Sequence, residues 1–121
     1  MTADPRTVRS RGADGYTPVG AAADVPPGTL LSVRLPTGDQ VVVMNVDGDL
    51  CALQDSCSHE SYALSAGELL PDGTIECVWH GARFDCRTGV ACHPPAVDGV
   101  AVYPVRVDQG TIMVGPRRPG H

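Results

Sequence analysis

Two short motifs in the middle of the chain carry side chains that bind transition metals. Cys57-Ser58-His59 supplies a thiolate and an imidazole, and Cys77-Val78-Trp79-His80 supplies a second pair after 17 intervening residues. A [2Fe–2S] cluster that is bound by two cysteines on one iron and by two histidines on the other needs both kinds of ligand from each of two loops. The candidate ligands of such a cluster are therefore Cys57, His59, Cys77 and His80.

A zinc site is the alternative interpretation, because Zn²⁺ also binds cysteine and histidine. Structural zinc sites usually pair ligands of one kind, as in C-x-x-C followed by H-x-x-x-H. Here each motif is mixed, and only Ser58 separates Cys57 from His59, which is tight for two ligands of one tetrahedral ion. The spacing favours an iron–sulfur cluster, and a zinc-stabilised interaction module stays open as a second class of function.

The residues that follow the second motif extend the pattern beyond four ligands. Cys77-Val78-Trp79-His80-Gly81-Ala82-Arg83-Phe84-Asp85 and then Arg87-Thr88-Gly89 resemble the second cluster loop and exit strand of Rieske proteins. Over residues 16–114 the chain is most similar to the small Rieske ferredoxins that serve bacterial non-haem iron oxygenases. The resemblance implies an all-β Rieske fold, an antiparallel β-sandwich with a small cluster-binding subdomain made of two loops. It also implies one [2Fe–2S] cluster per chain.

Four further positions bear on the reduction potential through the same resemblance. The respiratory-chain branch of the family joins its two loops by a disulfide, and Tyr62 and Trp79 stand at the places of those cysteines here. That branch also has a serine and a tyrosine whose hydroxyls donate hydrogen bonds towards the cluster, where this chain has Ala82 and Phe84. The loss of both donors predicts a low-potential carrier. The segment 93–96 corresponds to a proline-bearing loop that covers the cluster in Rieske proteins.

The rest of the chain has the composition of a small β-protein. Glycine (14) and proline (11) are frequent in a chain of 121 residues, which suits many short strands joined by turns. Asp47-Gly48 and Asp72-Gly73 are strong hairpin signals. The expected strands are residues 16–21, 29–35, 40–46, 50–53, 68–71, 74–78, 83–87, 100–107 and 111–114. No long amphipathic helix is expected, and residues 61–66 form a turn at most.

The chain is long enough for one domain with a proper core. We expect a flexible N-terminal tail over residues 1–15, the Rieske domain over 16–114 and a flexible C-terminal tail over 115–121. The sequence contains no apolar run of membrane-spanning length and no hydrophobic signal-peptide core. Five cysteines are an odd number for a secreted disulfide framework, so we expect a cytoplasmic monomer. Cys51, Cys86 and Cys92 are assigned to packing, and His93 to a loop.

The charge of the chain is unevenly distributed. No basic residue occurs between Pro36 and Ala82, a stretch that includes both ligand motifs. Its acidic residues are Asp39, Asp47, Asp49, Asp55, Glu60, Glu68, Asp72 and Glu76. The negative electrostatic potential of such an acidic stretch disfavours binding to nucleic acid or to an anionic membrane and favours docking on basic protein surfaces. The alternative is that the charge serves solubility alone.

Together these features predict an electron carrier and not an enzyme. A reductase would supply one electron at a time, and the cluster would pass it to a terminal non-haem iron oxygenase. Both proteins would dock near the cluster. One alternative is a Rieske-type ferredoxin of another redox or iron–sulfur assembly system. Another is the small subunit of a nitrite reductase, which shares the fold but often lacks the cluster ligands.

Overall fold

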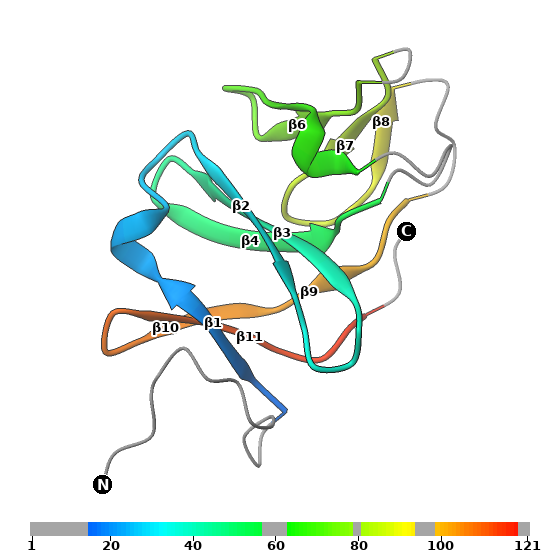
Figure 1. Cartoon of the computed structure of the whole chain (residues 1–121). Helices are drawn as coiled ribbons and strands as arrows, with labels where there is room; N and C mark the ends of the chain where they lie inside the picture. Colours follow the sequence, from blue (N-terminus) through cyan, green and yellow to red (C-terminus); the bar gives the residue numbers. More distant parts are fainter. Residues whose placement is uncertain (1–14, 57–62, 79–80, 94–98, 119–121) are drawn as a thin grey trace, which may run out of the picture.

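The computed structural model of the protein describes residues 15–56, 63–78, 81–93 and 99–118. In these ranges the chain forms short strands and two single-turn 3-10 helices, and all strand pairs are antiparallel (Figure 1). The strands are β1 (Thr17–Ala21), β2 (Leu30–Arg34), β3 (Gln40–Val46), β4 (Asp49–Gln54), β5 (Glu68–Leu69), β6 (Thr74–Glu76), β7 (Arg83–Asp85), β8 (Ala91–His93), β9 (Val102–Tyr103), β10 (Val105–Asp108) and β11 (Thr111–Val114). The 3-10 turns are η1 (Ala22–Asp24) and η2 (Leu64–Ala66). The predicted all-β class is confirmed.

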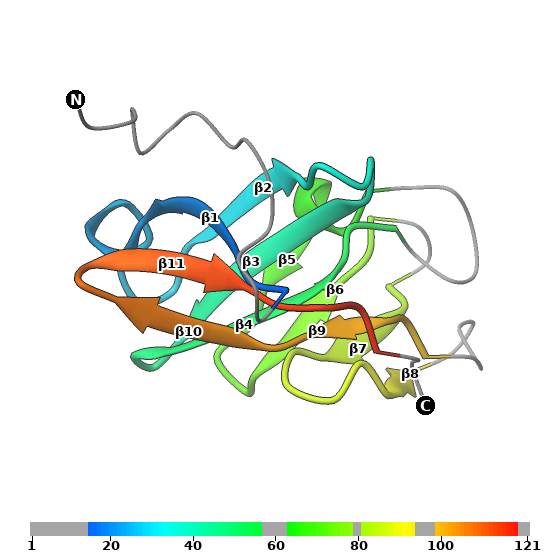
Figure 2. The same ribbon diagram turned by 90° about the horizontal axis from the view of Figure 1, so that it is seen from below.

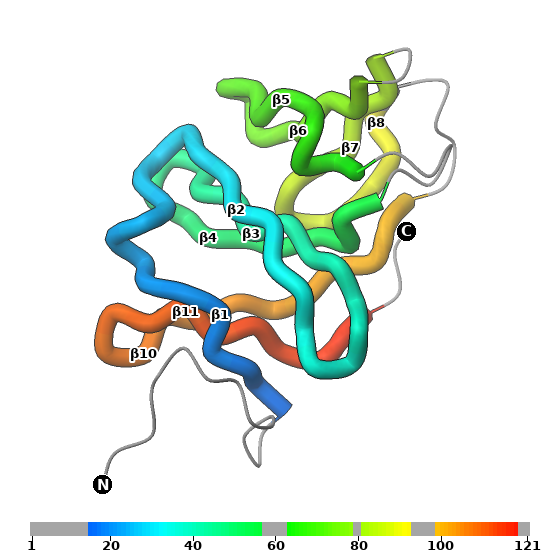
Figure 3. The backbone as a smooth tube through the Cα atoms, viewed as in Figure 1, coloured from blue at the N-terminus to red at the C-terminus, as the bar shows by residue number. Residues whose placement is uncertain are grey.

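The strands are arranged in three sheets. The central sheet has the order β2-β3-β4-β9, and the β1-β11-β10 sheet packs against one of its faces. The β5-β6-β7-β8 sheet packs against the other face and is the smaller subdomain (Figure 3). Seen from below, the β10–β11 hairpin runs across the front of the molecule (Figure 2). The predicted antiparallel sandwich with a small subdomain is therefore confirmed.

Strand β3 contributes to the cores on both sides of the central sheet. Val42, Met44 and Val46 belong to the core shared with the β5–β8 sheet. Val41 and Val43 belong to the core shared with the β1-β11-β10 sheet. Because successive side chains of a strand point to opposite faces, a strand that is covered on both faces is apolar at nearly every position. This explains the unbroken run of valines in the sequence.

Both predicted Asp-Gly hairpin turns are present. Asp47 and Gly48 have φ values of 54° and 97° and join β3 to β4. Asp72-Gly73 joins β5 to β6, with Gly73 at a φ of 88°. Asp47-Gly48 is a two-residue loop, which favours Asp-Gly because both positions need left-handed backbone conformations, whereas Asp72-Gly73 ends a longer loop in which only the glycine is left-handed. The meander β2-β3-β4 leads to Ser56, directly before the first ligand motif.

The structure corrects the sequence prediction at two places. The single strand expected over residues 100–107 is divided at Pro104, so that β9 pairs with β4 and β10 pairs with β11. Proline has no amide hydrogen to donate to a ladder, which favours a change of sheet at this point. The prediction of a loop at His93 is also wrong, because this residue ends strand β8, which pairs with β7. Too few residues separate Gly89 from Pro94 to give a strand signal.

The chain stays hydrogen bonded to the sheets beyond β11. The Gly115 amide donates to the Pro104 carbonyl at 2.7 Å, and Arg118 forms a two-way bridge with Val102. The hydrogen-bonded chain thus continues past Val114, the predicted end of the domain. Within the described ranges, no helical segment has the length and apolar character that a bilayer crossing requires.

Candidate metal centre

Cys77 is the one predicted ligand that lies within the described ranges. Cys57, His59 and His80 lie outside them, as do Tyr62, Trp79 and the proline-bearing segment 94–98. The Cys77 residue is 1% exposed and follows β6 directly. Its amide donates a 2.7 Å hydrogen bond to the Ala82 carbonyl, and Glu76 pairs with Arg83 in the ladder just below. Cys77 therefore lies where the chain leaves the β6–β7 ladder, and main-chain hydrogen bonds close the base of the hairpin tip.

Gly81 is required in this hairpin tip by its backbone conformation. Its φ is +72°, in the left-handed region that L-residues other than glycine rarely adopt. A Cβ atom built here would lie 3.7 Å from Oε2 of Glu76, which is an ordinary contact distance. The conformation of the loop, rather than a lack of space among the described atoms, thus explains the glycine.

The base of the first motif is held by the buried carboxylate of Asp55, a contact that the sequence analysis did not identify. Asp55 is 6% exposed, and its carboxylate accepts hydrogen bonds of 2.7 Å from the Ser65 amide, the Ser65 hydroxyl and the Ser32 hydroxyl. Asp55 precedes the segment 57–62 and Ser65 follows it. One side chain therefore ties the two ends of that segment together and to strand β2.

The chain segments at the bases of the first and second ligand motifs also lie against each other. A Cβ atom on Gly67 would come within 1.9 Å of the Glu76 carbonyl oxygen, so the chain leaving the first motif passes directly over the residue before Cys77. Leu64 and Ala82 are buried in the same core as Cys77. Only glycine permits this close approach. The fold thus brings together the described ends of two motifs that are far apart in the sequence.

Arginines from later in the chain pair with part of the predicted acidic stretch. The Glu76 carboxylate lies 3.1 Å from Nε of Arg83, and the Asp49 carboxylate lies 3.1 Å from Nη2 of Arg87. The hydrogen bond with Asp49 raises the pKa of Arg87. These pairings offset part of the charge of the acidic stretch, and Asp55 is buried, so the stretch is less acidic at the surface than the sequence suggests.

The surface of the smaller subdomain exposes both a charged residue, Asp72, and an apolar residue, Val78. Asp72 is exposed, and hydrogen bonds from the hydroxyl and amide of Thr74 lower its pKa. Val78, directly after Cys77, is 57% exposed although it is apolar. Apolar groups that stay in water beside a functional residue are candidates for contact with a partner.

Ala82 and Phe84 are both fully buried in the core that contains Cys77. Neither side chain carries a hydroxyl, so neither can donate a hydrogen bond to a sulfur.

The remaining cysteines differ from one another. Cys86 is buried and Cys51 is half-buried, as expected for packing roles, but Cys92 is exposed, which corrects its assignment.

The described residues fit the base of an iron–sulfur site. Cys77 offers a buried thiol at the root of one loop, and the Asp55 and Gly67 contacts hold the root of the other beside it. Iron–sulfur clusters are held by cysteine thiolates. Of the described side chains, no three from His, Cys, Asp or Glu converge on one point.

Comparison with known proteins extends this result to most of the chain. The family model of the Rieske [2Fe-2S] domain matches residues 15–104. The ferredoxin subunit of the 3-phenylpropionate/cinnamic acid dioxygenase of Escherichia coli (strain K12) is 41% identical over 92 residues, covering 76% of this chain and 85% of that protein.

Two solved structures show the same fold. In the complex of reduced oxygenase and oxidized ferredoxin of carbazole 1,9a-dioxygenase, the matching chain has a TM-score of 0.79 and 31% identity, over 84% of this chain and 94% of that one. The terminal oxygenase of carbazole 1,9a-dioxygenase from Novosphingobium sp. KA1 has a TM-score of 0.77 and 28% identity, over 89% of this chain but only 32% of that one. A Rieske domain holds a [2Fe–2S] cluster, and this chain belongs to the Rieske [2Fe-2S] domain family.

Proposed function

We propose that this chain is the ferredoxin component of a ring-hydroxylating dioxygenase system. It takes one electron at a time from a reductase and delivers it to a terminal non-haem iron oxygenase. The observation that carries the proposal is the extent of the match. The chain aligns with 85% of the E. coli ferredoxin subunit at 41% identity, and with 94% of the matching chain in the oxygenase–ferredoxin complex at 31% identity. The ferredoxin subunits it matches are electron carriers and not the catalytic component, which favours this role over a nitrite reductase subunit.

In this proposal one cluster is held per chain, with Cys57 and Cys77 on one iron and His59 and His80 on the other. The bound cluster supplies reversible one-electron transfer. Support comes from the mixed motifs and from Cys77, whose buried position at the root of the β6–β7 hairpin suits a thiolate ligand. The protein contributes the alignment of the two loops, through the Asp55 hydrogen bonds and the contact between Gly67 and Glu76.

The proposed carrier works at low potential. Hydrogen bonds from hydroxyls to cluster sulfur stabilise the reduced form and raise the potential. The buried Ala82 and Phe84 supply no such donor. The protein partners dock near the cluster, and the exposed Val78 beside Cys77 offers them an apolar contact. We place the carrier in the cytoplasm as a monomer, and the domain limits at residues 16 and 114 stay predictions.

Metal analysis of the purified chain tests the cluster. We expect two irons and two acid-labile sulfides per chain, little zinc, and the Rieske electron paramagnetic resonance signal after reduction. His59→Ala and His80→Ala should lose this signal, whereas Cys92→Ser should keep it, because Cys92 is exposed and lies outside both motifs. A folded, colourless protein with stoichiometric zinc would contradict the proposal.

The role as a carrier needs a separate measurement. The reduced chain is mixed with a terminal dioxygenase component, its aromatic substrate and oxygen, and reoxidation is followed by absorbance. Reoxidation coupled to product formation is expected. Rapid self-oxidation without product, or product formation by the chain alone, would point to a different function.

A further inference from the structure

Cys51 and Cys86 belong to the same core, which lies between the central sheet and the β5–β8 sheet. Cys51 lies on β4, and Cys86 directly follows β7. Cys86 is fully buried in this core, and the half-buried Cys51 packs against the same cluster of side chains. Neither cysteine belongs to the proposed ligand set. The pair therefore consists of two thiols, one from each sheet, with no part in the proposed electron transfer.

The two thiols are not equivalent. Interaction between the two side chains lowers the pKa of Cys51 and raises the pKa of Cys86. Burial further raises the pKa of Cys86. The protonated Cys51 thiol donates a 3.8 Å hydrogen bond to the Met44 carbonyl. Cys51 is thus the more acidic of the two thiols.

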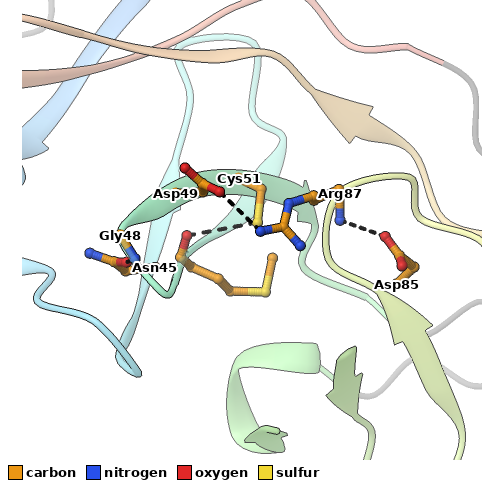
Figure 4. A network of polar contacts seen from close by, with 7 residues as sticks. Asn45, Gly48, Asp49, Cys51, Asp85 and Arg87 are labelled. Atoms are coloured by element: carbon orange, nitrogen blue, oxygen red, sulfur yellow. Dashed lines mark hydrogen bonds and ion pairs between the residues drawn. The ribbon is translucent and has the colours of Figure 1, made fainter. Parts of the chain in front are cut away.

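The surroundings give Cys51 access to solvent and a positive neighbour. A cleft of about 470 Å³ is lined by Cys51, Asp49 and Arg87, among other residues. Figure 4 shows the Arg87 guanidinium beside Cys51, with its Nη2 atom bonded to the Asp49 carboxylate at 3.1 Å. Arg87 favours the thiolate, whereas Asp85 and Asp49 oppose it. Reactive cysteines are typically partly exposed and near positive charge.

We propose that Cys51 and Cys86 form a peroxide-sensitive dithiol that closes into a disulfide between the two sheets. The Cys51 thiolate attacks one oxygen of hydrogen peroxide, the O–O bond breaks, and hydroxide leaves, so that Cys51 becomes a sulfenic acid. The Cys86 sulfur then attacks the Cys51 sulfur, the S–O bond breaks, and water leaves with the Cys86 proton. In total, two thiols lose two electrons and two protons, and one peroxide becomes two waters.

This bond would join the two sheets covalently. Strand β4 leads to the first motif, and β7 leads away from the second. A disulfide between Cys51 and Cys86 would therefore tie the strands that carry the two candidate cluster loops. Thiol reductants would reverse the change, since a disulfide is the reversible product of sulfenic acid condensation.

The test uses the full-length, cluster-loaded protein. It is treated with hydrogen peroxide, alkylated under denaturing conditions and mapped by mass spectrometry, while visible absorption reports cluster integrity. We expect a peptide pair linked through Cys51 and Cys86 in protein that keeps its absorption, and loss of the link after dithiothreitol. Cys92→Ser should behave as the wild type does.

Two variants resolve the order of events. Cys51→Ser should form no link, and Cys86→Ala should stop at a Cys51 sulfenic acid that dimedone traps. Should either variant fold poorly, the wild-type map decides alone. Bleaching of the cluster while Cys51 and Cys86 both remain alkylatable would overturn the proposal, as would a wild-type product of sulfinic acid at Cys51 or a link only through Cys92.

Discussion

Replacing Asp55 by alanine should loosen the root of the first ligand loop. The carboxylate accepts three hydrogen bonds of 2.7 Å, two from Ser65 and one from Ser32. A hydrogen bond to a charged acceptor contributes about 1.5–3 kcal/mol. Alanine also removes the cost of burying a charge, which is several kcal/mol. We therefore expect a net loss smaller than the sum of three bonds, about 2–4 kcal/mol.

The loss can be measured as a rate of cluster release. If opening of this loop root limits release, then 1.36 kcal/mol corresponds to a factor of ten in rate. Asp55→Ala should then lose its visible absorption in urea roughly 30 to 900 times faster than the wild type. Ser65→Ala removes one charge-assisted bond but keeps the amide bond, so about 10 to 150 times is expected.

Matched substitutions separate this effect from general destabilisation. Thr37→Ala removes a hydroxyl in an exposed turn, where it accepts only a 3.4 Å hydrogen bond, and should release the cluster at the wild-type rate. Asp55→Asn keeps one acceptor oxygen and should lie between the wild type and Asp55→Ala. Release from Asp55→Ala at the wild-type rate would refute the reasoning.

Three further outcomes are expected. The midpoint potential of the wild type should lie below zero, in the lower part of the roughly −150 to +300 mV range of Rieske centres. In protein-film voltammetry the double variant Ala82→Ser/Phe84→Tyr should raise this potential by roughly several tens of millivolts. An unmoved potential would mean that the new hydroxyls do not reach sulfur. Val78→Asn should slow electron transfer to the oxygenase without changing the potential. Val107→Asn, at another exposed valine, should leave the rate of electron transfer as it is in the wild type. Equal rates for Val78→Asn and the wild type in stopped-flow mixing would show that Val78 is not part of the docking surface. Burial, followed by a hydrogen bond to a carboxylate, raises the pKa of Tyr103 to about 12 from 10.0, so its contribution to stability is complete below pH 10 and is lost as the pH rises towards 12. The chain has no lysine to titrate in this window, and Tyr103→Phe should flatten the alkaline part of the curve of unfolding free energy against pH.

The sequence alone determined the fold class, the family and the candidate ligands. Each ligand motif is local, because the two ligands that one loop offers to the cluster lie a few positions apart, as in Cys57-Ser58-His59. Hairpin turns are local as well, since Asp47-Gly48 must itself adopt left-handed backbone angles. Features of this kind depend on near neighbours in the chain, so spacing and residue type are sufficient to predict them.

Tertiary structure decided which distant residues meet. Asp55 is only another acidic residue in the sequence, and its role follows from Ser32, which lies 23 positions away and reaches it from a neighbouring strand. The pairing of Asp49 with Arg87 likewise spans 38 positions and alters the expected surface charge. Such contacts depend on how three sheets pack, and no local pattern encodes that packing. Cys51 and Cys86 share one core for the same reason, because that core forms only where the central sheet lies against the β5–β8 sheet.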